Sequence, residues 1–369
     1  MSNPFEYQYP VGAARLVDRL GELEALQRAA ADTVAIRLAA PRRFGKTSLL
    51  NAHVASMEET GHRAVRVDLS KVATIVDVAG RVAQAYAELP APHDERIVDR
   101  LLSRFGLKIG VAGISLEVTG SSSPPHAEHA REALAGLLEL PRRLHEADGG
   151  LTVVCFDEFQ DLLTADAKLD GLVRSVIQHH RDGVAYVYAG SAPSLMRALF
   201  ADRERPLFGQ ASPLELPPLP AEEAVVDIAD LAEEEGTRLD PVTVGRIVRL
   251  AAGHPQRTML LAFHLFDLTD RGDDAPDLAA VALDRALEAT RDVHQSVWDG
   301  LRRAERAVLT ALADGDAPTG ARTADQHRIA RTSLQGALER LVAEQIHVLP
   351  RDGRPALVDP LLREWLRRR

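Results

Sequence analysis

The chain has 369 residues, of which 46% are hydrophobic and 27% are charged, an ordinary composition for a globular protein of two or three domains. A net charge of −10 excludes a protein that coats nucleic acid indiscriminately, because phosphate binding needs clustered cations. The single cysteine, Cys155, excludes an internal disulfide framework and a cysteine-based zinc site. The sequence shows no basic-then-apolar leader and no apolar run of about eighteen residues, so we expect a cytoplasmic protein without a membrane partner.

The first predicted elements are a helix that begins near residue 20 and a short strand at 33–40. Asp18 and Arg19 precede the helix, which has apolar residues at Leu20, Leu23 and Leu26. The charged pair fits a solvated helix start. The alternative is that this segment lies against the base of a bound nucleotide.

A tight turn follows the strand and leads into an amphipathic helix that ends at Gly61. This turn approximates the phosphate-loop pattern Gly-x-x-x-x-Gly-Lys-[Ser/Thr], with Ala40 at the first glycine. In such a loop the backbone N–H groups and the helix N-terminus face the phosphates, a lysine reaches the outer phosphates, and a hydroxyl holds Mg²⁺. The candidate nucleotide-binding residues are Pro41, Arg42, Arg43, Phe44, Gly45, Lys46, Thr47 and Ser48. If the Ala40 position requires a positive φ, alanine weakens the loop by about 1 kcal/mol. The simpler alternative for the whole segment is a glycine-containing turn in which Gly-Lys-Thr occurs by chance.

Further strands alternate with helices up to residue 216, which predicts a parallel sheet. We expect a helix at 75–89, a β-hairpin at 107–119 before the loop 120–125, and a helix at 127–147. The predicted strands are 64–69, 151–158, 184–191 and 212–216.

Two carboxylates, Asp157 and Glu158, end the strand at 151–158. Asp157 is positioned to bind Mg²⁺ beside Thr47, and Glu158 is the natural base to orient or deprotonate an attacking water. The alternative is that the pair caps the following helix. Two half-motifs in the right order, each at a strand end, favour nucleotide binding.

The proline-rich segment 216–220 is typical of a joint between domains. Four helices follow at about 220–235, 241–252, 255–268 and 276–290, and they predict an all-α lid at 217–296. From Val297 we expect helices at 302–313, 325–330 and 331–344, a two-stranded wing, and a closing helix after Asp359. The predicted fold class is therefore an α/β P-loop NTPase core at 1–216, a helical lid, and a winged helix-turn-helix at 297–369.

With these motifs in view, the chain resembles the archaeal-type P-loop ATPases, which belong to the STAND branch of the AAA+ relatives. The resemblance implies a nucleotide-binding core, a helical lid and a winged helix, with ATP and Mg²⁺ as cofactors. It also implies that Asp18 and Arg19 flank the adenine, that Ser191 is the polar sensor, and that His254 and Pro255 bring the lid onto the nucleotide. The motifs that carry it are Asn3-Pro4-Phe5, Asp18-Arg19, residues 41–50, Phe156–Gln160, Gly190-Ser191, Leu195-Met196, Pro206–Gly209, Gly253–Pro255, Asp359–Leu361 and Trp365.

The chain departs from this pattern at Ala40 and at Gln210, where such sequences tend to have an arginine that acts on a neighbouring subunit's phosphate. Arg203 and Arg205 are nearby substitutes, although a surface role fits both. We therefore expect slow hydrolysis of ATP. A homo-oligomer is one possible state of the protein, and the sequence does not decide it.

Three functions follow from these features. The first is an ATP-dependent switch, in which ATP closes the lid and winged helix and hydrolysis resets them. The second is DNA binding or transcription regulation through residues 297–369, which carry thirteen Arg against ten Asp and Glu, although winged helices also bind proteins. The third is a scaffold that binds nucleotide without turnover. The polar residues predicted to face outward for a DNA or protein partner are Thr332, Ser333, Gln335, Gly336, Glu339 and Arg340 on the third helix and Arg351 and Arg354 on the wing.

Overall fold

The computed structural model describes residues 2–12, 15–89, 107–110, 113–116, 127–180, 182–351 and 353–369. The chain divides into two compact units. One unit comprises Leu20–Ala40 and Lys46–Leu216; the other comprises Met1–Arg19, Pro41–Gly45 and Pro217–Arg369. The predicted phosphate loop is therefore divided between the two units: residues 41–45 are grouped with the second unit, and the helix that follows them belongs to the first.

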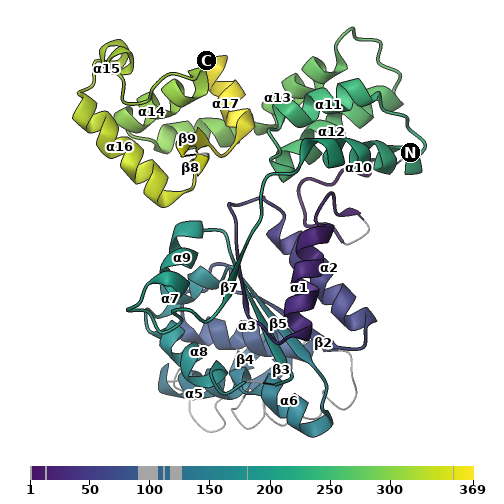
Figure 1. Cartoon of the computed structure of the whole chain (residues 1–369), viewed down its shortest axis with the longest axis vertical. Coiled ribbons are helices and arrows are strands. Elements are labelled where there is room, and N and C mark those ends of the chain that lie inside the picture. The colour runs from purple at the N-terminus through teal and green to yellow at the C-terminus, as the bar shows by residue number, and fades with distance from the viewer. Residues whose placement is uncertain are drawn as a thin grey trace. The chain divides into compact units, whose positions relative to one another are not determined.

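A five-stranded parallel sheet forms the centre of the first unit, with strand order β2-β5-β6-β1-β7 (Figure 1). Strands β5 and β6 are buried along their whole length, as expected for strands covered on both faces. Because the strands are parallel, the ends of β1, β5 and β6 lie at one edge of the sheet. The strands are β1 (Ile36–Ala39), β2 (Arg63–Asp68), β5 (Thr152–Asp157), β6 (Val184–Gly190) and β7 (Ser212–Glu215).

Helices cover both faces of this sheet. On one face, alternate strand residues such as Val154, Phe156 and Tyr188 belong to a hydrophobic cluster with α3, α5 and α8. The other residues of the same strands, Asp157 among them, face the opposite side, where α1 and α2 pack against each other. The helices are α1 (Leu20–Ala31), α2 (Lys46–Glu59), α3 (Ile75–Ala87), α5 (Ala127–Leu138), α6 (Leu140–Asp148), η2 (Phe159–Asp161), α7 (Leu162–Ala165), α8 (Leu169–Ile177) and α9 (Pro193–Ala201).

Two sequence predictions change in detail here. The single helix predicted at 127–147 is two helices, α5 and α6, because Pro141 lacks the N–H that a continuous helix would use. The predicted hairpin is present as β3 (Leu107–Gly110) and β4 (Gly113–Leu116), which pair in antiparallel. Its predicted continuation at 117–119 and the loop 120–125 lie outside the described residues.

Four helices follow in the second unit and share one hydrophobic cluster with Phe5 and Val17 near the start of the chain. Asp240 caps α11, with Pro241 at its first position, as the sequence predicts. The last of the four does not end near residue 290, as predicted, but continues to Gly300, because His294 is buried and Trp298 packs against Trp365. The helices are α10 (Ala221–Glu234), α11 (Pro241–Leu250), α12 (Pro255–Asp270) and α13 (Leu278–Gly300).

The C-terminal elements pack around a separate cluster that includes Val308, Leu334 and Leu362. They are three helices, an antiparallel hairpin and a closing helix, the arrangement of a winged helix-turn-helix. The helix predicted at 325–330 lies earlier, because Arg328 adopts a left-handed conformation that ends it. The elements are α14 (Arg303–Asp314), α15 (Ala321–His327), α16 (Arg331–Glu344), β8 (Val348–Arg351), β9 (Arg354–Leu357) and α17 (Pro360–Arg367). Across the part of the chain that the structure describes, no helix combines the length and apolarity needed to cross a membrane.

A buried histidine on α2 predicts that acid destabilises the first unit. His53 is fully buried, its two ring nitrogens have no hydrogen-bond partner in the described part of the chain, and burial lowers its pKa to about 4. This value lies below the unfolded pKa of about 6.5, so the stabilisation is present above pH 6.5 and is lost as the pH falls towards 4. We expect His53 to cost about 2 kcal/mol of unfolding free energy between pH 7 and pH 5.

Urea unfolding followed by far-UV circular dichroism at both pH values tests this prediction. The wild type should lose more stability than His53→Leu, by about the 2 kcal/mol assigned to this group. His129→Gln, at an exposed position, should behave as the wild type. An equal loss in the wild type and His53→Leu would show that His53 is not the titrating group.

Candidate nucleotide and metal site

The loop between β1 and α2 concentrates unusual backbone conformations. Arg43 and Gly45 have φ values of 67° and 85°, whereas Ala40 is not among the residues with positive φ. The penalty considered for alanine at the first glycine position therefore does not arise. Pro41 and Phe44 are buried, and Arg42 and Arg43 are exposed. A loop that turns through positive φ values directs successive N–H groups towards one side, which suits an anion.

Lys46 is the first residue of α2, with a side chain folded back onto the loop. It is only 4% exposed, and its Nζ donates to the carbonyl oxygen of Ala40 at 2.9 Å. Its positive charge acts on both Asp157 and Glu158. Ser48, also buried, lies in the same first turn of the helix. An ammonium at the N-terminus of a helix is the arrangement that the outer phosphates of a nucleotide require.

Thr47 and Asp157 bring the two half-motifs together. The Thr47 hydroxyl donates to Asp157 Oδ2 at 2.9 Å, although the residues are 110 positions apart in the chain. The Asp157 side chain is 5% exposed. Burial, together with the neighbouring charge of Glu158, raises its pKa, while Thr47 and Arg66 oppose the shift. A hydroxyl and a carboxylate in contact are oxygen donors of the kind that Mg²⁺ uses beside a polyphosphate, so these residues fit that metal.

Glu158 adopts a left-handed conformation, with φ 52° and ψ 44°, at the end of β5. Its Oε2 accepts from the Ser191 N–H at 3.0 Å and from Gln160 Nε2 at 2.7 Å. Burial alone would raise the pKa of Glu158, but hydrogen bonds from Ser191 and Gln160 and the charge of Lys46 hold it below its usual value. Glu158 is therefore a carboxylate at neutral pH, which is the form a general base needs.

Arg66 was not singled out from the sequence. It lies on β2 opposite Cys155, so its side chain shares a sheet face with Asp157, and its Nη1 donates to Asp157 Oδ2 at 3.3 Å. The sequence signal that could have identified it is a charged residue inside a strand that otherwise reads as buried. Gln160 was also missed as a partner of Glu158, although it is buried beside Gly190.

The remaining predicted nucleotide residues lie in the second unit. Arg19 is 2% exposed and donates to the Pro217 carbonyl at 2.8 Å, and the Asp18 N–H donates to Asp227. These contacts attach the segment before α1 to the chain that leads into α10. The adenine-flanking role of this pair stays a prediction.

His254 caps α12, with Pro255 at the first helical position, and packs against the loop. Its ring centroid lies 4.9 Å from that of Phe44. Burial lowers the pKa of His254 to about 4, so the ring is neutral at pH 7. Phe44 of the loop thus contacts the start of α12.

A buried ion pair joins the same end of α12 to α17. Arg257 Nε donates to Asp359 Oδ1 at 2.9 Å, its Nη2 bonds Oδ2, and His294 Nε2 lies 3.3 Å from Oδ2. Asp359 also caps α17 through the Leu361 N–H at 2.9 Å. Burial would raise the pKa of Asp359, but the hydrogen bond from His294 and the charge of Arg257 hold it well below its usual range.

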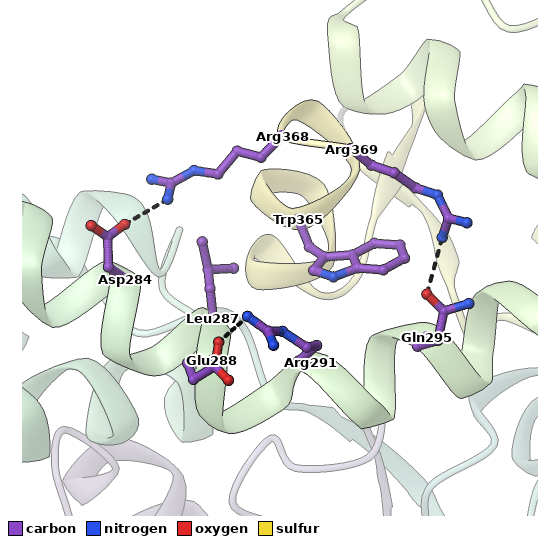
Figure 2. Close-up of a pocket in the computed structure, with 8 residues that line it drawn as sticks. All are labelled: Asp284, Leu287, Glu288, Arg291, Gln295, Trp365, Arg368 and Arg369. Atoms are coloured by element: carbon purple, nitrogen blue, oxygen red, sulfur yellow. Dashed lines mark hydrogen bonds and ion pairs between the residues drawn. The ribbon is translucent and has the colours of Figure 1, made fainter.

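A cavity of about 490 Å³ lies between α13 and α17 (Figure 2). Trp365 projects into this region, and each neighbouring arginine has a polar partner. Arg368 pairs with Asp284 at 2.6 Å, Arg291 with Glu288, and Arg369 bonds Gln295 at 3.3 Å. Because each of these arginines pairs with a residue of the same chain, we interpret the cavity as part of the packing contact between α13 and α17.

The arginines considered as substitutes near Gln210 differ in their surroundings. Arg205 pairs with the buried Asp170 at 3.2 Å, whereas Arg203 is exposed. Gln210 itself donates to the Phe208 carbonyl at 3.2 Å. Arg205 therefore has a structural partner, and no residue of this segment acquires an assigned catalytic role.

No protein-family model and no curated protein sequence matches the chain. Solved structures resemble it over almost its full length. A Walker-type ATPase of Pyrococcus abyssi matches with a TM-score of 0.69 and 19% identity, covering 99% of both chains. The ORC2 protein of Aeropyrum pernix, in ADPNP and ADP complexes, matches with a TM-score of 0.60 and 16% identity, covering 99% of this chain and 96% of that one.

A third structure, ORC1 of Aeropyrum pernix in complex with DNA, matches with a TM-score of 0.51 and 19% identity, covering 98% of this chain and 94% of that one. At these identities the likeness establishes a shared fold. With the parallel sheet, it confirms the predicted fold class: a P-loop NTPase core followed by helical and winged-helix parts.

Proposed function

We propose that this protein is a Mg²⁺-dependent ATPase that acts as a molecular switch of the STAND and AAA+ type. The observation that carries the proposal is the 2.9 Å contact between Thr47 and Asp157, which joins the loop helix to the strand end that bears Glu158. Lys46 beside them supplies the cation that a triphosphate needs. The likeness to nucleotide-bound structures of the same fold supports it.

In this proposal Gly45 and its neighbours offer backbone N–H groups to the phosphates, and Lys46 contacts the outer ones. Thr47 and Asp157 would hold Mg²⁺, which would supply positive charge to the phosphate oxygens. Glu158 orients a water and accepts its proton, since its pKa keeps it ionised. Ser191 fixes the Glu158 carboxylate and is the candidate phosphate sensor.

The switch part of the proposal rests on contacts within the second unit. Phe44 packs on His254, the His254 ring accepts from the Arg257 N–H at 3.4 Å, and Arg257 pairs with Asp359 at the start of α17. A conformational change of the loop on nucleotide binding would therefore alter the contacts of α12 and of α17. Arg19, His254 and Pro255 are the proposed adenine and lid contacts.

DNA binding through residues 297–369 is the second candidate. The outward residues predicted from the sequence on α16 are exposed, apart from the half-buried Gly336, and Arg351 and Arg354 are exposed on the hairpin. One structural neighbour was solved with DNA. Two features argue against a strongly nucleic-acid-binding surface. Arg340 pairs with Glu305 at 3.2 Å, and Glu339 adds negative charge beside it. A protein partner at this surface and a homo-oligomer stay proposals.

The ATP proposal is tested by titrating fluorescent ATP with Mg²⁺ into the wild type and Lys46→Ala. Loss of a charge-assisted contact of about 1.5–3 kcal/mol should raise the Kd about 10- to 150-fold. Lys168→Ala removes an exposed lysine and should leave the Kd unchanged. Equal affinity in the wild type and Lys46→Ala would defeat the proposal.

A further inference from the structure

Arg66 and Thr47 contact the same oxygen of Asp157. Thr47 Oγ1 donates to Asp157 Oδ2 at 2.9 Å, and Arg66 Nη1 donates to it at 3.3 Å. The guanidinium belongs to β2, the outermost strand on one side of the sheet, and lies on the face that α2 covers. A residue outside both nucleotide motifs thus touches the proposed metal ligand.

Two cations and two carboxylates lie together at this site. Lys46 and Arg66 are cations, and Asp157 and Glu158 are the neighbouring carboxylates. Because the Asp157 side chain is only 5% exposed, its negative charge needs a nearby counter-ion. Arg66 is the cation that contacts this carboxylate directly.

We infer that Arg66 is the resident counter-ion of Asp157 and gives up this place when Mg²⁺ binds with nucleotide. This inference rests on the proposed function. It follows that Arg66 competes with the metal for Asp157, and that without metal it reduces the repulsion between Asp157 and the phosphates. The two effects have opposite signs, which separates this role from a purely structural one.

The geometry of Arg66 suits a displaceable group. Its side chain is 32% exposed and makes a single hydrogen bond to Asp157. Arg257, by contrast, is 3% exposed and holds Asp359 with two nitrogens, as a fixed pair does. Two cations at one carboxylate oxygen repel each other, and a divalent ion binds oxygen more strongly than one long hydrogen bond. The long stem of Arg66 lets its charged end move into solvent.

The test compares the full-length wild type with Arg66→Met, which keeps the stem and removes the charge, and Arg66→Lys, which keeps the charge. Two affinities are measured: that of fluorescent ADPNP in EDTA, and that of Mn²⁺ for the protein–ADPNP complex by electron paramagnetic resonance. Arg63→Met is the matched control, because Arg63 lies on the same strand but pairs with Asp148. Thermal unfolding of each variant verifies folding.

Arg66→Met should bind Mn²⁺ about two- to fivefold more tightly, because the ion pair that it removes is partly exposed and contributes a correspondingly small free energy. It should bind metal-free ADPNP more weakly by a similar factor. Arg66→Lys and Arg63→Met should match the wild type in both. Unchanged affinities in Arg66→Met, or both affinities weakened together, would overturn the inference while leaving nucleotide binding intact. A wild type that binds no ADPNP with or without metal would overturn the proposed function and this inference with it.

Discussion

Glu158→Gln is expected to bind ATP with nearly wild-type affinity and to hydrolyse it about 10²–10⁴-fold more slowly. The amide keeps the shape of the side chain and can still accept from the Ser191 N–H, but it cannot take a proton from water. In the wild type, the effect of burial on the pKa of Glu158 is outweighed by Ser191, Gln160 and Lys46, and the lowered pKa keeps this carboxyl group ionised at neutral pH. Binding and chemistry should therefore separate in this one variant.

Turnover is best measured as phosphate release in a single turnover, with protein in excess over ATP, because the sequence leads us to expect slow hydrolysis. Glu204→Gln changes an exposed glutamate and should release phosphate at the wild-type rate. If the wild type and Glu158→Gln show equal, negligible rates while both bind ATP, the protein is a nucleotide-binding scaffold. In that case the ATPase part of the account is wrong.

Asp359→Ala is expected to lower the unfolding free energy of the second unit by about 3–5 kcal/mol, since removing one partner leaves a buried charge uncompensated. Arg257 is 3% exposed and would lose both of its bonds to Asp359. The same substitution removes the cap of α17 and the partner of His294. Few exposed substitutions approach this size.

The two tryptophans of the chain make this measurement specific, because Trp365 lies on α17 and Trp298 packs against it. Urea unfolding followed by tryptophan fluorescence therefore reports on this region. Asp240→Ala is the matched control: it removes an aspartate cap from α11 without leaving a buried arginine unpaired, so it should lower the unfolding free energy much less than Asp359→Ala does. Similar losses in the two variants would show that Asp359 acts only as a helix cap.

Much of the core could be predicted because local pattern and chemistry coincide there. Apolar runs that end in Asp157-Glu158 and Gly190-Ser191 read as buried parallel strands, and the structure has them as β5 and β6. The Gly-Lys-Thr turn predicted that Lys46 and Thr47 begin a helix, which they do. Because the carboxyl ends of parallel strands lie at one edge of the sheet, the order of the two motifs in the sequence was enough to predict that Thr47 and Asp157 lie close together.

The rest depends on long-range contacts that no local pattern reveals. Helix α15 has Thr323 as its buried residue and little apolar period, so its position could not be read accurately. The last turns of α13 are polar in sequence and persist because Trp298 meets Trp365 from a distant helix. The pairing of Arg66 with Asp157 likewise spans separate strands.

The central claim is that Lys46, Thr47, Asp157 and Glu158 serve one nucleotide. A crystal structure of the protein with ADPNP and Mg²⁺ tests it most directly. We predict a single metal ion bound by Thr47 Oγ1 and Asp157, directly or through a water, with the terminal phosphates at Lys46 and Glu158 facing the last of them. A nucleotide bound elsewhere, or phosphates at the loop with Asp157 turned away from the metal, would contradict the account.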